Sequence, residues 1–462
     1  MTHEHPTVEV DSSRKLSSLD ATLLVMGGIV GIGIFFAPQS IAQLIREPGA
    51  YMAMWLFGGL IALCAAWSFA ELGGTFPRSG GWFVYLREAF GDFPAYLFAW
   101  VVLFVISTGA MAAIIGFTAS MLHSALPGLV GGPDSLSHHV AAISIIVALT
   151  GLTLCGIKHA ARLQNICMVV KALVLLGLAI TGLVFTTGDA PIAADPATLV
   201  PLAPIENSLP ERMLAALLPI FFTFGGWQLI CYIAPELREP RRSLPRAIVL
   251  GVLGVMALYL TANAAFLQGL GPEQLARDPT FASTLARTAL GTTGERLFSA
   301  GIAISAIGVC AVNVIAGPWL YVAMAREKLF FATIGRVHPR RGVPVNALLL
   351  QAALVLVYYF NSTLQDLVIS VVFIEWIFHG LAALALMRLR FRRPELPRPF
   401  RSPFYPLAPL VYAATAVLIV IGTLWQEDRS ITWTGLSLLA VGALVYRPWR
   451  MLVERAGPSQ QG

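Results

Sequence analysis

Twelve apolar stretches, each near the ~20 residues that a helix needs to cross a bilayer, constrain the fold of this chain most strongly. Only 12% of its residues are charged, against about 25% in soluble proteins, and the mean hydropathy is +0.74. The sequence therefore predicts an all-α polytopic membrane protein with twelve transmembrane helices in a single domain over residues 1–462. The stretches lie at about 19–43, 50–73, 93–122, 138–157, 163–186, 212–236, 244–268, 295–325, 343–360, 364–387, 406–425 and 431–449.

The positive charges are distributed unevenly among the loops between these stretches. With the N-terminus inside, 24 of the 31 Lys and Arg residues fall on the inner side and six on the outer side, while Lys171 lies in a membrane stretch. Membrane proteins typically show this excess in their cytoplasmic loops. The pattern predicts a multi-pass protein of the cell (plasma or inner) membrane with both termini cytoplasmic. It also attributes the net charge of +6 to topology and argues against nucleic-acid binding.

Glycine interrupts the first and the sixth apolar stretch, at Gly31-Ile32-Gly33 and at Gly225-Gly226. Glycine loosens a helix, and an unpaired peptide group is tolerated at membrane depth only where it lines a cavity or is buried in protein. Paired breaks in two halves point to the binding site of a transporter. Five stretches begin with each break, and five crossings reverse the orientation. The sequence therefore predicts a five-plus-five inverted repeat with discontinuous helices 1 and 6: 19–186, then 212–387, with helices 11 and 12 at 406–449.

A broken helix offers two kinds of free backbone group. The N–H end of its second half attracts an anion such as a carboxylate, and the C=O end of its first half attracts an ammonium. Two adjacent breaks can therefore hold both ends of a free amino acid. The competing interpretation is that these glycines only allow close helix packing. Two breaks in corresponding positions favour the binding site.

The residues around both breaks are similar to those of a known family. The first break resembles the Gly-Ser-Gly-Ile-Phe motif of the amino acid–polyamine–organocation (APC) superfamily, and the sixth stretch resembles the helix 6 motif of its L-type amino-acid transporter branch. The resemblance covers about residues 18–410 and implies alternating access. The matching segments are Gly31-Ile32-Gly33-Ile34-Phe35, Phe222-Thr223-Phe224-Gly225-Gly226-Trp227, Phe76-Pro77-Arg78-Ser79-Gly80-Gly81, Glu236-Leu237-Arg238-Glu239-Pro240, Leu244-Pro245-Arg246-Ala247, Ala323-Met324-Ala325-Arg326-Glu327 and Arg393-Pro394-Glu395-Leu396-Pro397-Arg398-Pro399-Phe400.

The resemblance implies specific roles for the substrate-binding residues. The backbone of Gly31, Ile32 and Gly33 would receive the substrate carboxylate. Phe222 would close over the substrate from outside, and the carbonyl groups of Phe224 and Gly225 would receive the amine. Trp227, directly after the second break, completes the set. Ile32 replaces the family's usual Ser or Thr, so one hydroxyl donor is lost while the peptide N–H groups remain.

Two charged residues lie near the middle of apolar stretches, and we assign both to coupling. Lys171 is about eight residues from the nearest helix end, near 12 Å at 1.5 Å per residue, so it should face an interior partner and not snorkel to the interface. The resemblance implies that it points at the helix 1 break, where sodium-coupled relatives keep a cation. Glu375 could relay a proton, contact a cationic substrate, pair with His379, or serve only as a structural hydrogen-bonding group.

Cofactors, metals and covalent partners are not expected. The five cysteines fall within the predicted spans and show no ligand spacing, so neither a disulfide nor a metal site is predicted. Family members with a disulfide-linked ancillary subunit carry a cysteine between helices 3 and 4, but residues 123–137 contain none. No hydrolase or phosphate-binding motif appears, so neither an enzyme nor a catalytic residue is expected. The expected partners are a free amino acid and membrane lipids.

The function predicted from these features is sodium-independent secondary transport of small to medium neutral L-amino acids, by exchange or by proton coupling. Phe224, Ile32 and Trp376 offer an apolar region for the substrate side chain. The alternative is a cationic amino acid or polyamine transporter, which Glu375 favours. A second class, a membrane amino-acid sensor without transport, would need a large signalling tail, and the tails here have about 18 and 13 residues.

Overall fold

The computed structural model describes residues 15–184, 199–202, 204, 208–424 and 430–456, with side chains described except at 362–373 and 430–432. Most of the predicted loop between helices 5 and 6 (187–211) lies outside the described residues. Helices dominate the rest. In chain order they are α1 (Ser18–Ile29), η2 (Gly33–Phe35), α2 (Ala37–Leu44), α3 (Pro48–Thr75), α4 (Trp82–Phe90), α5 (Asp92–Val101), η3 (Val102–Ile106), α6 (Ser107–Ala125), α7 (Leu136–Leu154), α8 (Ile157–Val184), α9 (Leu209–Phe224), η5 (Trp227–Glu236), α10 (Pro240–Arg277), α11 (Phe281–Arg326), α12 (Val345–Tyr359), α13 (Ser362–Arg392), α14 (Leu407–Leu424) and α15 (Ser430–Ala456).

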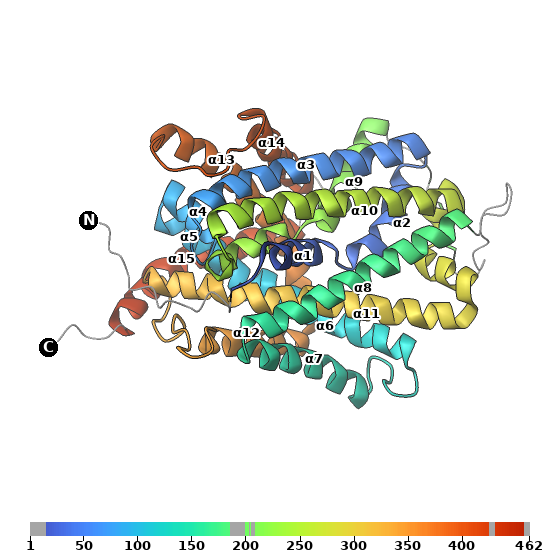
Figure 1. Ribbon diagram of the computed structural model, residues 1–462, viewed down its shortest axis with the longest axis horizontal. Helices are drawn as coiled ribbons and strands as arrows, with labels where there is room; N and C mark the ends of the chain where they lie inside the picture. The colour runs from blue at the N-terminus through green and yellow to red at the C-terminus, as the bar shows by residue number, and fades with distance from the viewer. Residues whose placement is uncertain (1–14, 185–198, 203, 205–207, 425–429, 457–462) are drawn as a thin grey trace.

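Each of the twelve predicted apolar stretches coincides with a helix or with a broken helix. Within the described residues, nine helices are long and apolar enough to cross a membrane, and α1 and α12 are shorter apolar helices. The long helices lie side by side along the molecule (Figure 1). The prediction of an all-helical, polytopic membrane fold is therefore confirmed. The division into two repeats of five helices stays a prediction.

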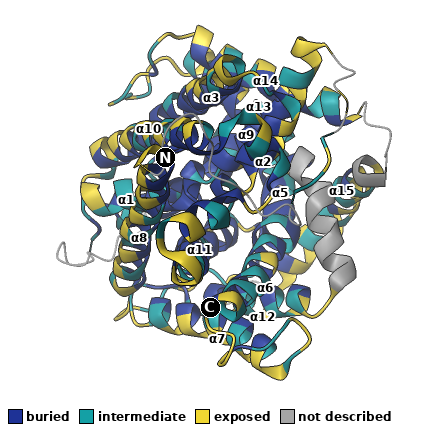
Figure 2. Cartoon of the chain, turned by 90° about the vertical axis from the view of Figure 1, so that its right-hand side faces the viewer, coloured by how far each residue is buried: buried dark blue, intermediate teal, exposed yellow. Residues whose placement is uncertain are grey.

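The interior is formed by helices from both halves of the chain. α10 packs against α1, α3 and α8, and α11 packs against α6 and α8. Buried residues fill the centre of the bundle, whereas exposed residues lie on its outer faces (Figure 2). The broken first helix therefore lies among its neighbours and not at the periphery.

α8 shows how one helix divides between lipid and protein. From Ile166 onward its exposed side chains are apolar, and six of them recur every three or four residues, as expected for a stripe along one face. Lys171 lies on the opposite face and is fully buried. A stripe of this composition suits the hydrocarbon of a bilayer, while the charged group faces the protein. The stripe consists of Ile166, Val169, Leu173, Leu176, Ile180 and Leu183.

Some helix ends differ from the predicted ones. α10 and α11 extend beyond the predicted stretches, past backbone kinks at Gly271 and Gly291, where φ is positive. The predicted end of the tenth apolar stretch at residue 387 was also wrong, because α13 continues to Arg392. The helix ends there because a residue that precedes a proline, here Arg393 before Pro394, disfavours helical backbone. Cys155 was predicted to lie within a span, but it lies just after the end of α7 and is exposed.

The segment after α13 is tied to α3 by a buried carboxylate. Glu71 of α3 accepts hydrogen bonds from the Arg390 guanidinium and from the Ser402 amide, and it forms a further ion pair with Arg398 at 3.4 Å. The Glu71 side chain is 1% exposed. Two guanidinium groups and an amide thus compensate the cost of burying this charge. Sequence analysis did not single out Glu71, since a carboxylate near a helix end gives no sign of its partners.

Candidate functional site

The first helix is broken between Ile29 and Gly33. Val30 leaves the helical conformation with φ −69° and ψ 88°, and η2 begins at Gly33. Among the described residues, no hydrogen-bond acceptor is found for the backbone N–H groups of Gly31, Ile32 and Gly33. These three residues are half-buried. Such a cluster of free N–H groups suits a carboxylate.

The carbonyl groups on the other side of this break are already occupied. The Lys171 ammonium donates hydrogen bonds to the Gly27 and Val30 carbonyl oxygens at 2.9 and 2.7 Å. Gly308 of α11 makes room for this side chain, because a β-carbon there would lie 3.1 Å from Nζ. Lys171 therefore places its ammonium at the C-terminal end of α1, where the helix dipole favours a cation. Its functional role stays a prediction.

The second break lies between α9 and η5. Gly225 is extended, and Gly226 adopts a left-handed conformation with φ 108° that glycine accommodates without steric cost. The Gly226 N–H donates to the Gln228 side-chain oxygen at 3.0 Å. The chain then continues as a tight helix from Trp227.

The two breaks are in direct contact. A β-carbon added at Gly28 would lie 2.9 Å from the Gly226 carbonyl oxygen, and one added at Gly33 would lie 3.2 Å from the Thr223 hydroxyl oxygen. Small residues let two backbones approach closely in a membrane, so helix packing explains part of this glycine pattern. The same approach places the free amides of the first break beside the unwound turn of the second.

Tyr259 of α10 bridges both breaks, and sequence analysis missed it. Its hydroxyl lies 3.2 Å from the carbonyl oxygen of Ile29 and 3.2 Å from that of Thr223. One hydroxyl hydrogen can serve only one of the two carbonyls at a time. No local signal distinguishes this tyrosine, because a Tyr in an apolar stretch is more often a packing or interface residue.

The predicted aromatic residues occupy different environments. Phe224 is buried, and its ring packs edge-on against Tyr259 at 5.2 Å. Trp227 is buried, with its ring 4.8 Å from that of Phe69. Phe222 is 63% exposed and lies beside Gly33. It therefore does not cover a closed pocket in this conformation, and its gating role stays a prediction.

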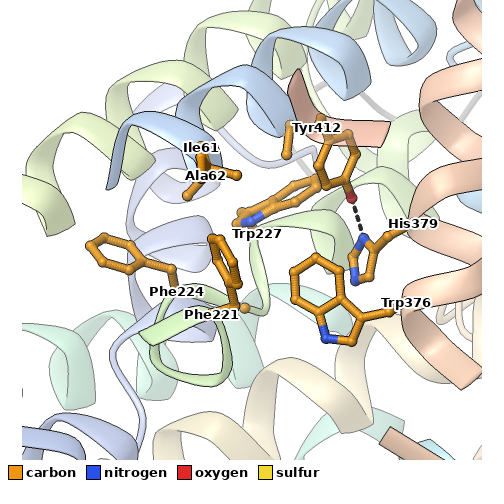
Figure 3. Close-up of a pocket in the computed structure, with 10 residues that line it drawn as sticks. Ile61, Ala62, Phe221, Phe224, Trp227, Trp376, His379 and Tyr412 are labelled. Carbon is orange, nitrogen blue, oxygen red and sulfur yellow. Dashed lines mark hydrogen bonds between the residues drawn. The ribbon is translucent and has the colours of Figure 1, made fainter. Parts of the chain in front are cut away.

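A small cavity adjoins the second break (Figure 3). Its volume of about 30 Å³ is enough for about one water molecule and far too small for an amino acid. Phe224 and Trp376, two of the residues expected around the substrate side chain, both line it, and Ile32 does not. The remaining lining residues come from α3, α9, η5, α13 and α14: Ile61, Ala62, Ala65, Phe221, Gly225, Trp227, His379 and Tyr412.

A larger hollow lies beyond the first break, between η2, α6 and α11. Its volume is about 470 Å³, so it can admit an amino acid. Phe35 and Phe36, which follow Gly33 in the chain, form one wall. Met121, Phe298, Ser299 and Ile302 also line the hollow. Under the predicted topology this hollow opens to the outside.

Glu375 lies behind the second break. Its carboxylate is 3.5 Å from the Gln228 amide nitrogen and 4.0 Å from His379 Nε2. The structure thus brings Glu375 together with His379, which is one of the arrangements considered from the sequence. Gln228, which joins Glu375 to the amide of Gly226, was not anticipated because amides are common in helices of every kind.

These breaks and their partners are the setting in which the comparisons with known proteins are informative. Residues 16–446 match the amino acid permease family. The chain belongs to this family. The resemblance to the APC superfamily is therefore confirmed, and the chain is an amino-acid transporter of this type.

Relatives of this permease support the same conclusion. It is 29% identical over 437 residues to the large neutral amino acids transporter small subunit 2 of Oryctolagus cuniculus, covering 94% of this chain and 80% of the relative. It is 29% identical over 430 residues to a serine/threonine exchanger of Bacillus subtilis (strain 168), covering 92% and 94%. The human cystine/glutamate transporter is 26% identical over 444 residues, covering 95% and 85%.

The permease has no cluster of metal-binding residues in the part that the structure describes, since no group of three or more His, Cys, Asp or Glu side chains there could hold a metal ion. The polar groups at the two breaks are instead backbone amides and carbonyls, the Lys171 ammonium, the Tyr259 and Thr223 hydroxyls and the Gln228 side-chain amide. These groups include both donors and acceptors, which are the kinds of group that hydrogen-bond the two ends of a zwitterion.

Proposed function

We propose that this permease is a sodium-independent secondary transporter of small to medium neutral L-amino acids. It works by alternating access, through exchange or proton coupling, across the cell membrane with both termini in the cytoplasm. The observation that carries this proposal is that one helix break combines two features. The amides of residues 31–33 are free on one side of it, and the Lys171 ammonium binds the carbonyls of Gly27 and Val30 on the other.

In this proposal the free amides bind the carboxylate of the substrate. Three N–H groups at one break form a site for an anion, and Gly225 and Phe224 at the other break present the unwound turn for the ammonium. Because backbone groups meet both charged ends, both the α-carboxylate and the α-amino group are required. Phe222 lies beside Gly33, where it can close over the substrate from the outer hollow.

The position of Lys171 supports the proposed sodium independence. Its ammonium already provides a positive charge at the carbonyl end of α1. A sodium ion bound to the same carbonyls would be repelled by it. Lys171 and Glu375 are therefore the residues that we assign to coupling, the first to the helix 1 break and the second to the helix 6 break.

The apolar surroundings favour a neutral side chain. Phe224 and Trp376 line the cavity beside the second break, and burying a second charge there would cost several kcal/mol unless it were paired. The names of two relatives refer to neutral amino acids and to serine and threonine. We also propose that the chain acts without a disulfide-linked subunit, since residues 123–137 contain no cysteine.

Competition for uptake tests the substrate class. Purified protein in liposomes would take up radiolabelled L-alanine in the presence of each of the other L-amino acids and of putrescine. We expect neutral amino acids to compete best and analogues that lack the carboxylate or the amine to fail. If lysine, arginine or putrescine competes best, and Glu375→Gln removes that preference, the cationic alternative replaces this proposal.

A further inference from the structure

A chain of polar side chains leads away from the second break into the protein. The Gly226 N–H donates to Gln228 Oε1 at 3.0 Å, and Gln228 Nε2 donates to Glu375 at 3.5 Å. His379 Nε2 lies 4.0 Å from the same carboxylate oxygen, and His379 Nδ1 is hydrogen-bonded to the Tyr412 hydroxyl (Figure 3). Three elements, η5, α13 and α14, are thus joined to one backbone amide of the substrate site.

The Glu375 carboxylate, which lies at the centre of this series of polar side chains, has no cationic partner among the described Lys and Arg residues. The titratable groups that face it are His379 on its own helix, Tyr412 of α14 and Tyr232 of η5. Trp82 of α4 contributes no charge, and its ring lies 4.6 Å from that of His379. A carboxylate among aromatic rings without a cation binds a proton more readily than one in water.

Protonation would change what Glu375 can do. As a carboxylate it accepts hydrogen bonds, and it holds the Gln228 amide with its oxygen toward Gly226. As a carboxylic acid it becomes a donor, and the Gln228 side chain can accept from it only by turning its oxygen Oε1 toward Glu375. That oxygen would then be shared with, or lost by, the Gly226 N–H. The proton on Glu375 thereby alters the hydrogen bonding of a glycine that touches Gly28 of the first break.

The neighbouring groups provide a route for the proton. If the Tyr412 hydroxyl donates to His379 Nδ1, the ring proton resides on Nε2 and faces Glu375. The cavity of about 30 Å³ that His379 and Tyr412 line has room for about one water molecule. A water in this cavity would lie beside both Gly225 of the break and His379, which line it.

We propose that Glu375 is the binding site of a proton that is transported together with the amino acid, and that Gln228 transmits its occupancy to the helix 6 break. This inference rests on the proposed function and selects proton coupling over exchange alone. A proton from the outer solution binds the Glu375 carboxylate in the outward-open state and is released to the inner solution after the breaks reorient. No other bond forms or breaks.

Proton and amino-acid flux measured together test this inference. Liposomes containing the protein and a trapped pH-sensitive dye would be clamped at zero membrane potential, with outside pH 6.5 and inside pH 7.5. One proton per amino acid predicts accumulation up to about tenfold for one pH unit, accompanied by acidification of the lumen. Glu375→Gln should abolish both accumulation and acidification while keeping counterflow of L-alanine between loaded liposomes.

A matched control and a second variant keep the outcome interpretable. Glu454→Gln changes an exposed carboxylate that pairs with Arg450, and it should retain full accumulation. If Glu375→Gln does not fold, Gln228→Leu should keep proton binding but lower gradient-driven accumulation at least severalfold. If the wild type shows counterflow without any acidification, the proton-coupling inference is overturned and the proposed transport function stands. No L-alanine flux in any condition overturns the proposed transport function itself.

Discussion

Gly28 and Gly226 touch backbone to backbone, so that the two helix breaks form a single contact at the centre of the protein. A β-carbon at Gly28 would lie 2.9 Å from the Gly226 carbonyl oxygen, and one at Gly226 would clash with the Gly28 carbonyl. Residues 198 positions apart (226 minus 28) are thus held against each other by the lack of side chains. Because of this contact, a side chain added at either glycine would push the two helix breaks apart.

Gly226→Ala should abolish or strongly reduce transport. A left-handed backbone costs an L-residue about 1–2 kcal/mol, and the clash with Gly28 adds to this, so we expect a loss of at least about tenfold in initial uptake rate. Gly177→Ala on α8 is the control, because nothing lies within 4 Å of the added β-carbon. Wild-type uptake by Gly226→Ala would mean that the breaks separate without cost.

Lys171→Ala should nearly abolish transport while leaving membrane insertion intact. Two charge-assisted hydrogen bonds of about 1.5–3 kcal/mol each are lost, which corresponds to a decrease of about 100-fold or more in rate. Insertion should become easier, because a central lysine costs about 2.5–3.5 kcal/mol. Uptake in liposomes, normalised to the inserted protein, measures the effect.

The control for Lys171 is Lys158→Ala near the start of the same helix, which should transport normally. Should Lys171→Ala retain wild-type flux, the lysine would have only a structural role at the end of α1.

Uptake should persist when sodium is replaced by choline. The Lys171 ammonium occupies the carbonyl oxygens of Gly27 and Val30, so no sodium ion is needed to neutralise this end of the helix. Initial rates of L-alanine uptake in the two salts at equal ionic strength provide the measurement. A strong dependence on sodium would contradict the assigned role of Lys171.

Phe222→Ala should lower the transport rate severalfold and surface expression much less. Phe222 is 63% exposed and lies beside Gly33, so its ring can move over a bound amino acid and exclude water. Leu218→Ala, one turn earlier on α9 and also exposed, is the control. Equal losses of rate and expression in Phe222→Ala would indicate a packing role.

Glu71→Gln should destabilise the protein. Removing one charge of a buried ion pair typically costs about 3–5 kcal/mol, because Arg390 and Arg398 would keep their charges without a counter-ion. The thermal unfolding temperature in detergent measures this effect. Glu454→Gln is the control, since its ion pair with Arg450 is about half exposed and should contribute close to nothing. Unchanged unfolding in Glu71→Gln would show that the arginines find other partners.

The sequence by itself was sufficient for the helices and for the location of the two breaks. Hydropathy and glycine act locally, so apolar stretches of sufficient length predict spans, and Gly31 and Gly225 mark where the helical hydrogen bonds stop. The burial of Lys171 could also be anticipated, because an unpaired charge in lipid is too costly to face outward. The exact ends of α10 and α11 could not, since kinks and extensions depend on neighbouring helices.

Only the tertiary structure decided which groups meet. Tyr259 bridges Ile29 and Thr223, Glu71 binds Arg390, and Gln228 joins Gly226 to Glu375, although none of these pairings leaves a pattern in the local sequence. Hydrogen-bond partners are set by the packing of helices that are far apart in the chain, and a polar residue type fixes only what a side chain can donate or accept. The residue types were therefore readable from the sequence, whereas their partners required the fold.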